Sequence, residues 1–367
     1  MKKYILENYE DQLNHQVIHM DQGVCYCPEF LASRKMHDYP SRKLQLARAV
    51  FKGDLPANDY IGGIVFSGIL SREGERWQNF RENPEDCTDV MILSRAMLRS
   101  KGYQSAAPEQ LKALLQENGG HINKADKWDL PTDPASDTAI LLDDAAAEGF
   151  AAGQDHLAAY CRDQGISFIN EAEPVFLGFE YFACGQVEEG TTRLSQVVQM
   201  LKEKGASKVL TISAQAYYML KVFAGKLGID IPFEVSYLPD LLGTLEPEEP
   251  AYVYGGSFNL RYLCNGDQLN DQIRNSKETP IKESAEFIPL LEGDRRVNKL
   301  TIWQRPVGPE YACFGTEEKI LEMIKEMAAT DIRKAAADYV VSYEPTAMAV
   351  LQENLKDKRV VSYLELL

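Results

Sequence analysis

The first third of the chain carries apolar residues at the spacing of amphipathic helices. In residues 42–51, Leu44, Ala47 and Phe51 recur at intervals that place them on one helical face. Ser41 precedes this run and is the expected N-cap, because its hydroxyl can accept a hydrogen bond from an amide of the first turn. Residues 89–101 and 108–117 repeat the helical period. The pattern predicts a helical N-terminal segment.

Beyond this segment, short apolar runs alternate with helical periods. Residues 139–142, 208–213 and 233–238 have the length and composition of strands. Strands that alternate with helices indicate a mainly parallel sheet with helices on its faces, so the predicted fold class is α/β. The helical periods cover residues 146–163, 191–204 and 215–225.

This part of the chain contains an internal repeat. The sequence VSYL at 235–238 returns at 361–364, and the strand-like residues 209–213 have a counterpart at 339–343. Further back, FACG at 182–185 corresponds to ACFG at 312–315. The offset between the copies is nearly constant, which indicates a tandem duplication of one α/β unit.

Two stretches rich in proline and acidic residues read as linkers. They cover residues 127–139 and 246–250. The domains predicted from them are residues 1–130, 138–246 and 250–367.

Charge and composition exclude several classes of partner. The formal net charge is −16 over 367 residues, and the sequence has no cluster of Lys and Arg of the kind that binds nucleic acid. An acidic surface also disfavours anionic lipid. No apolar run is long enough to cross a membrane, and no apolar segment follows the first lysines as in a signal peptide. We therefore expect a cytoplasmic protein that binds neither nucleic acid nor membrane directly. The seven cysteines are odd in number and widely spaced, which argues against a disulfide framework.

Two N-terminal stretches have the spacing C-x2-C-x2-C-x3-C-P with most cysteines replaced. They cover residues 17–28 and 64–79. Cys27, before Pro28, is the one ligand place that still holds a cysteine. The other ligand places hold Val17, Met20 and Gly23 in the first stretch and Gly68, Ser71, Gly74 and Gln78 in the second, where Asn79 replaces the proline.

Each repeat also keeps one cysteine of a Cys-Cys-Gly turn. Cys184 precedes Gly185 in the first repeat, and Cys313 stands just before the corresponding turn in the second. The later Cys-x-x-Cys places fall on Ser213 and Ala216 in the first repeat and near Tyr343 and Thr346 in the second, whose opening cysteine place falls near Ser257.

These motifs resemble the fused iron–sulfur proteins of the heterodisulfide reductase D type, which include the iron–sulfur subunits of glycolate oxidase and of anaerobic glycerol-3-phosphate dehydrogenase. The resemblance extends over nearly the whole chain. It implies a helical ferredoxin-like domain followed by two tandem CCG-type α/β domains in pseudo-twofold relation. The family holds 4Fe-4S clusters through Cys thiolates. Here Cys27, Cys184 and Cys313 are vestigial cluster positions that stand alone, so no cluster or other cofactor is expected.

The resemblance implies a place in an oxidoreductase complex without catalysis by this chain itself. The expected function is that of a structural or regulatory subunit, paired with an intact paralogue or a flavin dehydrogenase. Two alternatives stay open. The chain could serve as an electron-transfer subunit with a cluster completed by a partner's ligands, or as a small-molecule binding protein that reuses an emptied pocket.

Outside these motifs no catalytic or metal site is predicted. Cys27 is expected to be a buried, inert thiol. His15 and His19 share a helical face and could bind a metal with Asp11, but solvated or packed histidines are the simpler interpretation.

Two further interpretations concern the strand end at 143–144 and the emptied places. Asp143 and Asp144 follow a strand, where they could line a pocket or, as we prefer, begin a helix. Emptied cluster places are expected to have collapsed, with Met20, Phe314 and Tyr343 among the inward-pointing groups, since unfilled voids destabilise a fold.

Overall fold

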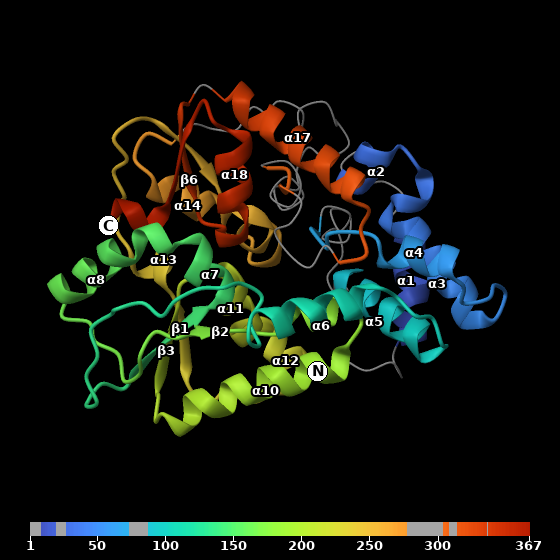
Figure 1. Ribbon diagram of the computed structural model, residues 1–367, viewed down its shortest axis with the longest axis horizontal. Coiled ribbons are helices and arrows are strands. Elements are labelled where there is room, and N and C mark those ends of the chain that lie inside the picture. Colours follow the sequence, from blue (N-terminus) through green and yellow to red (C-terminus); the bar gives the residue numbers. More distant parts are fainter. Residues whose placement is uncertain (1–8, 20–26, 73–86, 277–303, 308–313, 336) are drawn as a thin grey trace. The chain divides into compact units, whose positions relative to one another are not determined.

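A computed structural model describes residues 9–19, 27–72, 87–276, 304–307, 314–335 and 337–367 (Figure 1). The chain forms two compact units. The first contains residues 1–113, 179–190 and 280–331, and the second contains residues 114–178, 191–279 and 332–367. The predicted domains 1–130, 138–246 and 250–367 follow different boundaries, and this division stays a prediction.

The described part of the first unit consists of helices and loops. Helix α3 is its centre, packing against α1, α4 and α5, and its residues Leu44, Ala47 and Val50 are buried. Helices α6 and α17 contribute residues to both units. The helices are α1 (Tyr9–His19), α2 (Pro28–Ser33), the 3-10 turn η3 (Met36–Asp38), α3 (Pro40–Lys52), α4 (Asp59–Phe66), α5 (Cys87–Ser100), α6 (Ala107–Glu117), α9 (Phe179–Ala183) and α17 (Glu318–Lys334).

The start of α3 differs from the expectation. The predicted N-cap, Ser41, is the second residue of the helix, and Tyr39 occupies the cap position without a side-chain hydrogen bond. Pro40 begins the helix because its ring fixes a helical φ and it has no amide hydrogen to leave unpaired. The periods at 89–101 and 108–117 are confirmed as α5 and α6.

The second unit contains two parallel sheets (Figure 1), which confirms the predicted α/β class. The first has the order β2-β1-β3-β4 and the second the order β5-β6-β7. The VSYL copies lie at the ends of β4 and β7. The strands are β1 (Thr138–Asp143), β2 (Pro174–Val175), β3 (Lys208–Thr211), β4 (Glu234–Tyr237), β5 (Ala251–Tyr254), β6 (Tyr339–Ser342) and β7 (Arg359–Ser362).

Short helices follow most of these strands. The predicted helix at 146–163 is divided at the 3-10 turn η6 (Ala151–Gly153), and the one at 215–225 contains a π-helical turn. In chain order the remaining helices are α7 (Asp144–Gly149), α8 (Gln154–Asp163), α10 (Val187–Glu203), α11 (Ala214–Tyr218), η7 (Met219–Phe223), α12 (Ala224–Lys226), α13 (Leu238–Leu241), η8 (Phe258–Tyr262), α14 (Gly266–Gln272), η10 (Pro345–Ala347), α18 (Met348–Asn354) and η11 (Tyr363–Leu366).

One hydrophobic core serves both sheets. It includes Leu142 and Leu210 of the first sheet together with Val253 and Val341 of the second. Trp128 belongs to the same core, and its backbone pairs with Ala172. The stretch at 127–139, which reads as a linker, therefore packs as part of this unit.

The close approach of α7 to η10 generates a stability prediction. A Cβ atom on Gly149 would overlap the carbonyl oxygen of Pro345, and backbone gives way less easily than a flexible side chain. Gly149→Ala should lower the free energy of unfolding by about 3 kcal/mol, measured by urea denaturation. Gly243→Ala is the matched control, because Gly243 has open space around it and an ordinary φ. Equal stability of the two variants would contradict this packing.

Candidate functional site

Cys27, the cysteine kept from the first ferredoxin-type stretch, is buried at the start of α2. Its thiol donates a hydrogen bond to Oε2 of Glu29 at 3.2 Å, while Oε1 of Glu29 accepts one from the amide of Ile69 at 2.9 Å. Burial raises the pKa of the Cys27 thiol well above its ordinary value, and the Glu29 charge adds to this. A cluster ligand is a thiolate, whereas these surroundings favour the neutral thiol.

Gly68, at a ligand place of the second stretch, is enclosed by charged side chains. Its φ is +131°, and a Cβ there would lie 2.9 Å from Nζ of Lys43, 3.0 Å from Oε1 of Glu29 and 3.7 Å from Nη2 of Arg95. A cysteine at this position would be strained and would have to displace these groups. We call Glu29, Lys43 and Arg95 the charged cluster.

Backbone carbonyls hold the two cations of the charged cluster. Lys43 donates from Nζ to the carbonyl of Ser67 at 2.6 Å. The fully buried Arg95 donates to the carbonyl of Val65 at 3.1 Å and to that of Ala183 at 2.7 Å. Because Ala183 precedes Cys184, the charged cluster links the ferredoxin-type places to the first Cys-Gly turn. Cys184 itself is buried.

The carboxyl edge of the first sheet carries a second group of buried polar residues. For a doubly wound sheet of order 2-1-3-4, ligands bind between the ends of β1 and β3. Asp143 ends β1 and caps α7 through the amide of Ala146, which confirms the helix start, and Ser213 follows β3 and caps α11. The Oδ1 atom of Asp143 is buried without a hydrogen-bond partner in the described part of the chain. Burial raises the pKa of Asp143 to about 6, although the Ser213 hydroxyl acts in the opposite direction.

The tyrosines of the repeated VSYL sequence connect the two sheets. The hydroxyl of Tyr363 donates to the carbonyl of Ile212, just beyond β3, at 2.8 Å. The hydroxyl of Tyr237 donates to Oδ1 of Asn259, beyond β5, at 3.1 Å, and Nδ2 of Asn259 donates to the carbonyl of Gly255. Each repeat thus places a tyrosine at the carboxyl edge of the other repeat's sheet. Burial raises the pKa of both phenols.

Tyr343 lies near a place that the resemblance assigns to a Cys-x-x-Cys pair, and it is fully buried as expected. Its ring stacks on that of Tyr363 with centroids 4.7 Å apart, and its hydroxyl donates to Oε1 of Gln272 at 2.9 Å. Phe314 is only partly buried, and Met20, Cys313, Gly23, Gly74, Gln78 and Asn79 lie outside the described residues. The remaining places in the second unit, at Ser213, Ala216 and Ser257, are buried, and Thr346 is partly buried.

His121 and Asp144 form a pair that sequence analysis missed. Nδ1 of His121 lies 2.7 Å from Oδ1 of Asp144, whose Oδ2 accepts a hydrogen bond from the amide of Ile122 at 2.8 Å. Burial raises the pKa of Asp144, and the contacts with His121 and Ile122 partly offset the rise. The pair fixes the imidazole but has no third ligand, since the described residues contain no cluster able to hold a metal ion. The side chains of His15 and His19 lie outside the described set.

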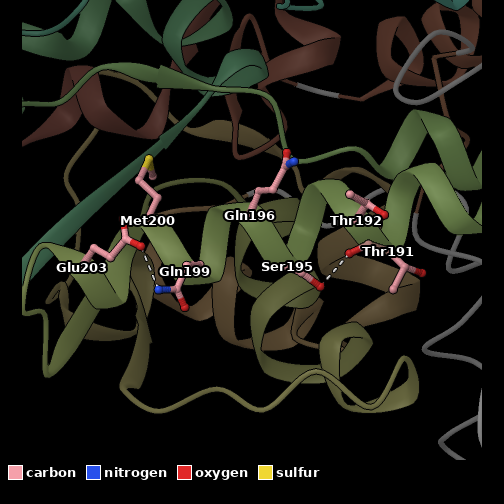
Figure 2. Close-up of a pocket in the computed structure, with 7 residues that line it drawn as sticks. All are labelled: Thr191, Thr192, Ser195, Gln196, Gln199, Met200 and Glu203. Atoms are coloured by element: carbon pink, nitrogen blue, oxygen red, sulfur yellow. Dashed lines mark hydrogen bonds between the residues drawn. The ribbon is translucent and has the colours of Figure 1, made fainter.

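Described residues line a hollow on each of the two units. One, in the first unit, has a volume of about 500 Å³ and is lined by Lys35, Met36, His37, Arg42, Gln45 and Leu46. The other, on α10, is about 480 Å³, and Figure 2 shows that one helix supplies its whole lining. There the hydroxyl of Ser195 donates a hydrogen bond to the carbonyl of Thr191, and Nε2 of Gln199 donates one to Oε1 of Glu203 (Figure 2). No convergent catalytic groups line either hollow.

Comparisons with known proteins assign no function. No family model matches the chain, and no curated protein matches it. Among solved structures, an aspartate racemase homologue from Pyrococcus horikoshii OT3, PH1733, is 10% identical, with a TM-score of 0.25 over 62% of this chain and 94% of that one. A likeness at this level carries no argument about fold or function. None of the described helices has the length and apolar character needed to cross a membrane.

The buried carboxyl group of Asp143 predicts a pH-dependent change in stability. Its pKa rises from 3.8 to about 6 on folding, so charging it costs the folded state up to about 3 kcal/mol. This cost grows as the pH rises from about 4 to about 6 and is complete above pH 6. Asp143→Asn keeps a capping side chain and should therefore be more stable than wild type at pH 7, with the gain vanishing below about pH 4.

Urea denaturation across this pH range measures the effect. Asp163→Asn is the control, because it removes the same charge from an exposed position. A difference from wild type that does not vary with pH, or that has the opposite sign, would refute the raised pKa of the buried Asp143 carboxyl group.

The hydroxyl of Tyr363 provides a separate test of the link between the sheets. Tyr363→Phe keeps the stack on Tyr343 but leaves the carbonyl of Ile212 without this donor, at an expected cost of about 1–2 kcal/mol. Tyr217→Phe should be nearly neutral, because the half-exposed Tyr217 makes no side-chain hydrogen bond within the described residues. Thermal or chemical unfolding compares the two, and equal effects would argue against the contact.

Proposed function

We propose that this chain is a non-catalytic, cluster-less relative of an electron-transfer iron–sulfur subunit. It would act in the cytoplasm as a structural or regulatory subunit of a redox complex, bound to an intact paralogue or a flavin dehydrogenase. The proposed family and the proposed partner proteins both follow from the resemblance of its motif spacings to the fused heterodisulfide reductase D type.

The charged cluster is the observation that carries the proposal. Where the resemblance places thiolates around an iron–sulfur cluster, Cys27 donates to a carboxylate, and Gly68 leaves room for Lys43 and Arg95. Carboxylate oxygens and cations held by carbonyls are unsuited to the soft irons of a cluster. They are well suited to holding α2, α3, α4 and α5 in place without one.

The identity of the domains and their pseudo-twofold relation belong to the same proposal. We take the first unit to contain a degenerate ferredoxin-like domain and the two sheets to belong to CCG-type domains in pseudo-twofold relation. The reciprocal contacts of Tyr237 and Tyr363 support this relation, because copies related by a twofold would each place the same side chain on the other.

One observation favours the small-molecule alternative. Asp143 presents a buried, unpartnered oxygen between the ends of β1 and β3, where sheets of this order bind ligands. Tyr363, stacked on Tyr343, donates to the chain leaving β3 at the same edge. A ligand there would have to displace this tyrosine pair, so the scaffold function is better supported.

Iron analysis tests the proposal directly. Protein purified without oxygen should be colourless, with iron and acid-labile sulfide far below the roughly four irons of one cluster. Cys27→Ser should leave the spectrum and the stability nearly unchanged, since a serine hydroxyl can also donate to Glu29. Near-stoichiometric iron that is lost in Cys27→Ser would establish the alternative in which a cluster remains.

A further inference from the structure

The pair of His121 and Asp144 lies at the carboxyl end of the first sheet, where β1 and β2 end side by side. The last residues of these two parallel strands pair with each other, so Asp144 and Phe176, which follow them, are neighbours. Arg193 of α10 donates from Nε to the carbonyl of Phe176 at 2.7 Å. Its charge favours the ionised form of Asp144, as that of His121 does. One buried carboxyl group of the second unit therefore has a histidine and an arginine beside it.

Asp144 determines which nitrogen of His121 carries the hydrogen. Its Oδ1 lies 2.7 Å from Nδ1 of His121, and its Oδ2 accepts from the amide of Ile122. An ionised carboxylate can only accept, so we assign the hydrogen to Nδ1 and leave a lone pair on Nε2. Within the described residues, Nε2 has no hydrogen-bond partner. The imidazole is thus fixed in orientation while its second nitrogen stays available.

Arg193 is held in a comparable way. Its Nε is tied to the carbonyl of Phe176, and its Cζ lies 5.9 Å from the centroid of the Phe176 ring. The two Nη groups make no hydrogen bond or close ion pair with any residue that the structure describes. Two contacts thus orient the guanidinium and leave its outer nitrogens for another group.

The site is open to solvent on the histidine side. The side chain of His121 is 35% exposed. Gly119 and Gly120 precede it with φ of +67° and +100°, and Cβ atoms added to them would meet nothing within 4 Å. Only glycine adopts this backbone readily, so the turn before the imidazole carries no side chain that would cover it. A small molecule can therefore reach Nε2 without a change in the fold.

The two available groups together select the chemistry of a ligand. The guanidinium needs anionic oxygens and binds two of them with paired hydrogen bonds, whereas the lone pair of Nε2 needs a hydrogen-bond donor. A carboxylate ion has no hydrogen to donate, and an ammonium ion has no acceptor. A phosphate group has both, because its second pKa of about 6 leaves part of its hydrogen in place near neutral pH.

We propose that His121 and Arg193, oriented by Asp144 and Phe176, bind a small phosphate group, either free phosphate or a phosphomonoester. Its oxygens accept from the Nη groups of Arg193, and its hydroxyl donates to Nε2 of His121. If the proton passes to Nε2, the phosphate keeps the electron pair of the O–H bond, and the imidazolium donates to both Asp144 and the phosphate. None of these residues stands at a place that the resemblance assigns to a cysteine, so the site goes beyond the proposed function.

An NMR titration of the purified full chain, labelled with ¹⁵N in its histidine side chains, tests the proposal at pH 7 and constant ionic strength. The chain has five histidines, and the resonances lost in His121→Gln identify His121. Inorganic phosphate should shift the Nε2 resonance of His121 saturably and leave the other histidines unmoved. Sulfate has the same shape without a hydrogen to donate, and it should bind at least about fivefold more weakly.

Variants measured by calorimetry assign the binding to these residues. Arg193→Gln should lose about tenfold or more in phosphate affinity, because a neutral amide cannot replace the paired, charge-assisted hydrogen bonds. Arg162→Gln is the matched control, since it removes the same charge from an exposed position of α8 and should bind like wild type. His121→Gln should lose about fivefold. Circular dichroism checks folding, and Arg193→Lys, with an expected few-fold loss, replaces Arg193→Gln if that variant is unfolded.

Methyl phosphate distinguishes the two sources of the phosphate group. Tighter binding than inorganic phosphate would assign a phosphomonoester, and weaker binding would assign the free ion. Four results would overturn the proposal: no saturable shift of His121 with either phosphate, equal binding of sulfate, equal losses in Arg193→Gln and Arg162→Gln, or unchanged affinity in folded His121→Gln.

Discussion

The hydroxyl groups of Tyr237 and Tyr363 are buried in the second unit, and each needs a hydrogen-bond partner there. Both find it beyond a strand of the opposite sheet: Tyr237 donates to the amide oxygen of Asn259, and Tyr363 donates to the carbonyl of Ile212. Two parallel sheets can therefore share one core while the polar ends of their strands are closed against each other. Tyr343 stacks into this arrangement. A repeat that lost its tyrosine would leave the other repeat's edge unsatisfied.

In the first unit the corresponding constraint is electrostatic. Buried charges are tolerated only when hydrogen bonds replace the lost water. Arg95 and Lys43 meet that condition with backbone carbonyls, and Glu29 meets it with an amide and the Cys27 thiol. The hydrogen bonds of Glu29, Lys43 and Arg95 join α2, the chain after α4 and the turn before Cys184 to one another. Under the proposed function, these contacts take the place of a cluster, since a bound metal contributes its binding energy to folding.

The regular elements could be predicted because each depends on local periodicity. Leu44 and Ala47 marked the buried face of α3, and the apolar run before Asp143 marked β1 and the helix start after it. The VSYL repeat pointed to two similar sheets, although not to the contacts of its tyrosines, which depend on how the sheets pack.

The charged cluster was missed because Lys and Arg are normally solvated. The helical spacing of these two residues nevertheless indicated that they are buried. Lys43 lies four residues before Ala47, and Arg95 four residues after Met91, so both stand on the buried faces of their helices. The pairing of His121 with Asp144 joins residues too far apart in the chain for any periodicity to connect. The packing of residues 127–139 was hidden by their prolines, which are also common in loose linkers.

The central proposal is that this fold is held by its own side chains at the places where the resemblance to the iron–sulfur family would put clusters. The most direct test is the urea unfolding midpoint of anaerobically purified protein with and without a strong iron chelator. The account predicts the same midpoint under both conditions, because Glu29, Lys43 and Arg95 need no metal. A midpoint that falls on chelation, together with the release of about four irons per chain, would contradict it.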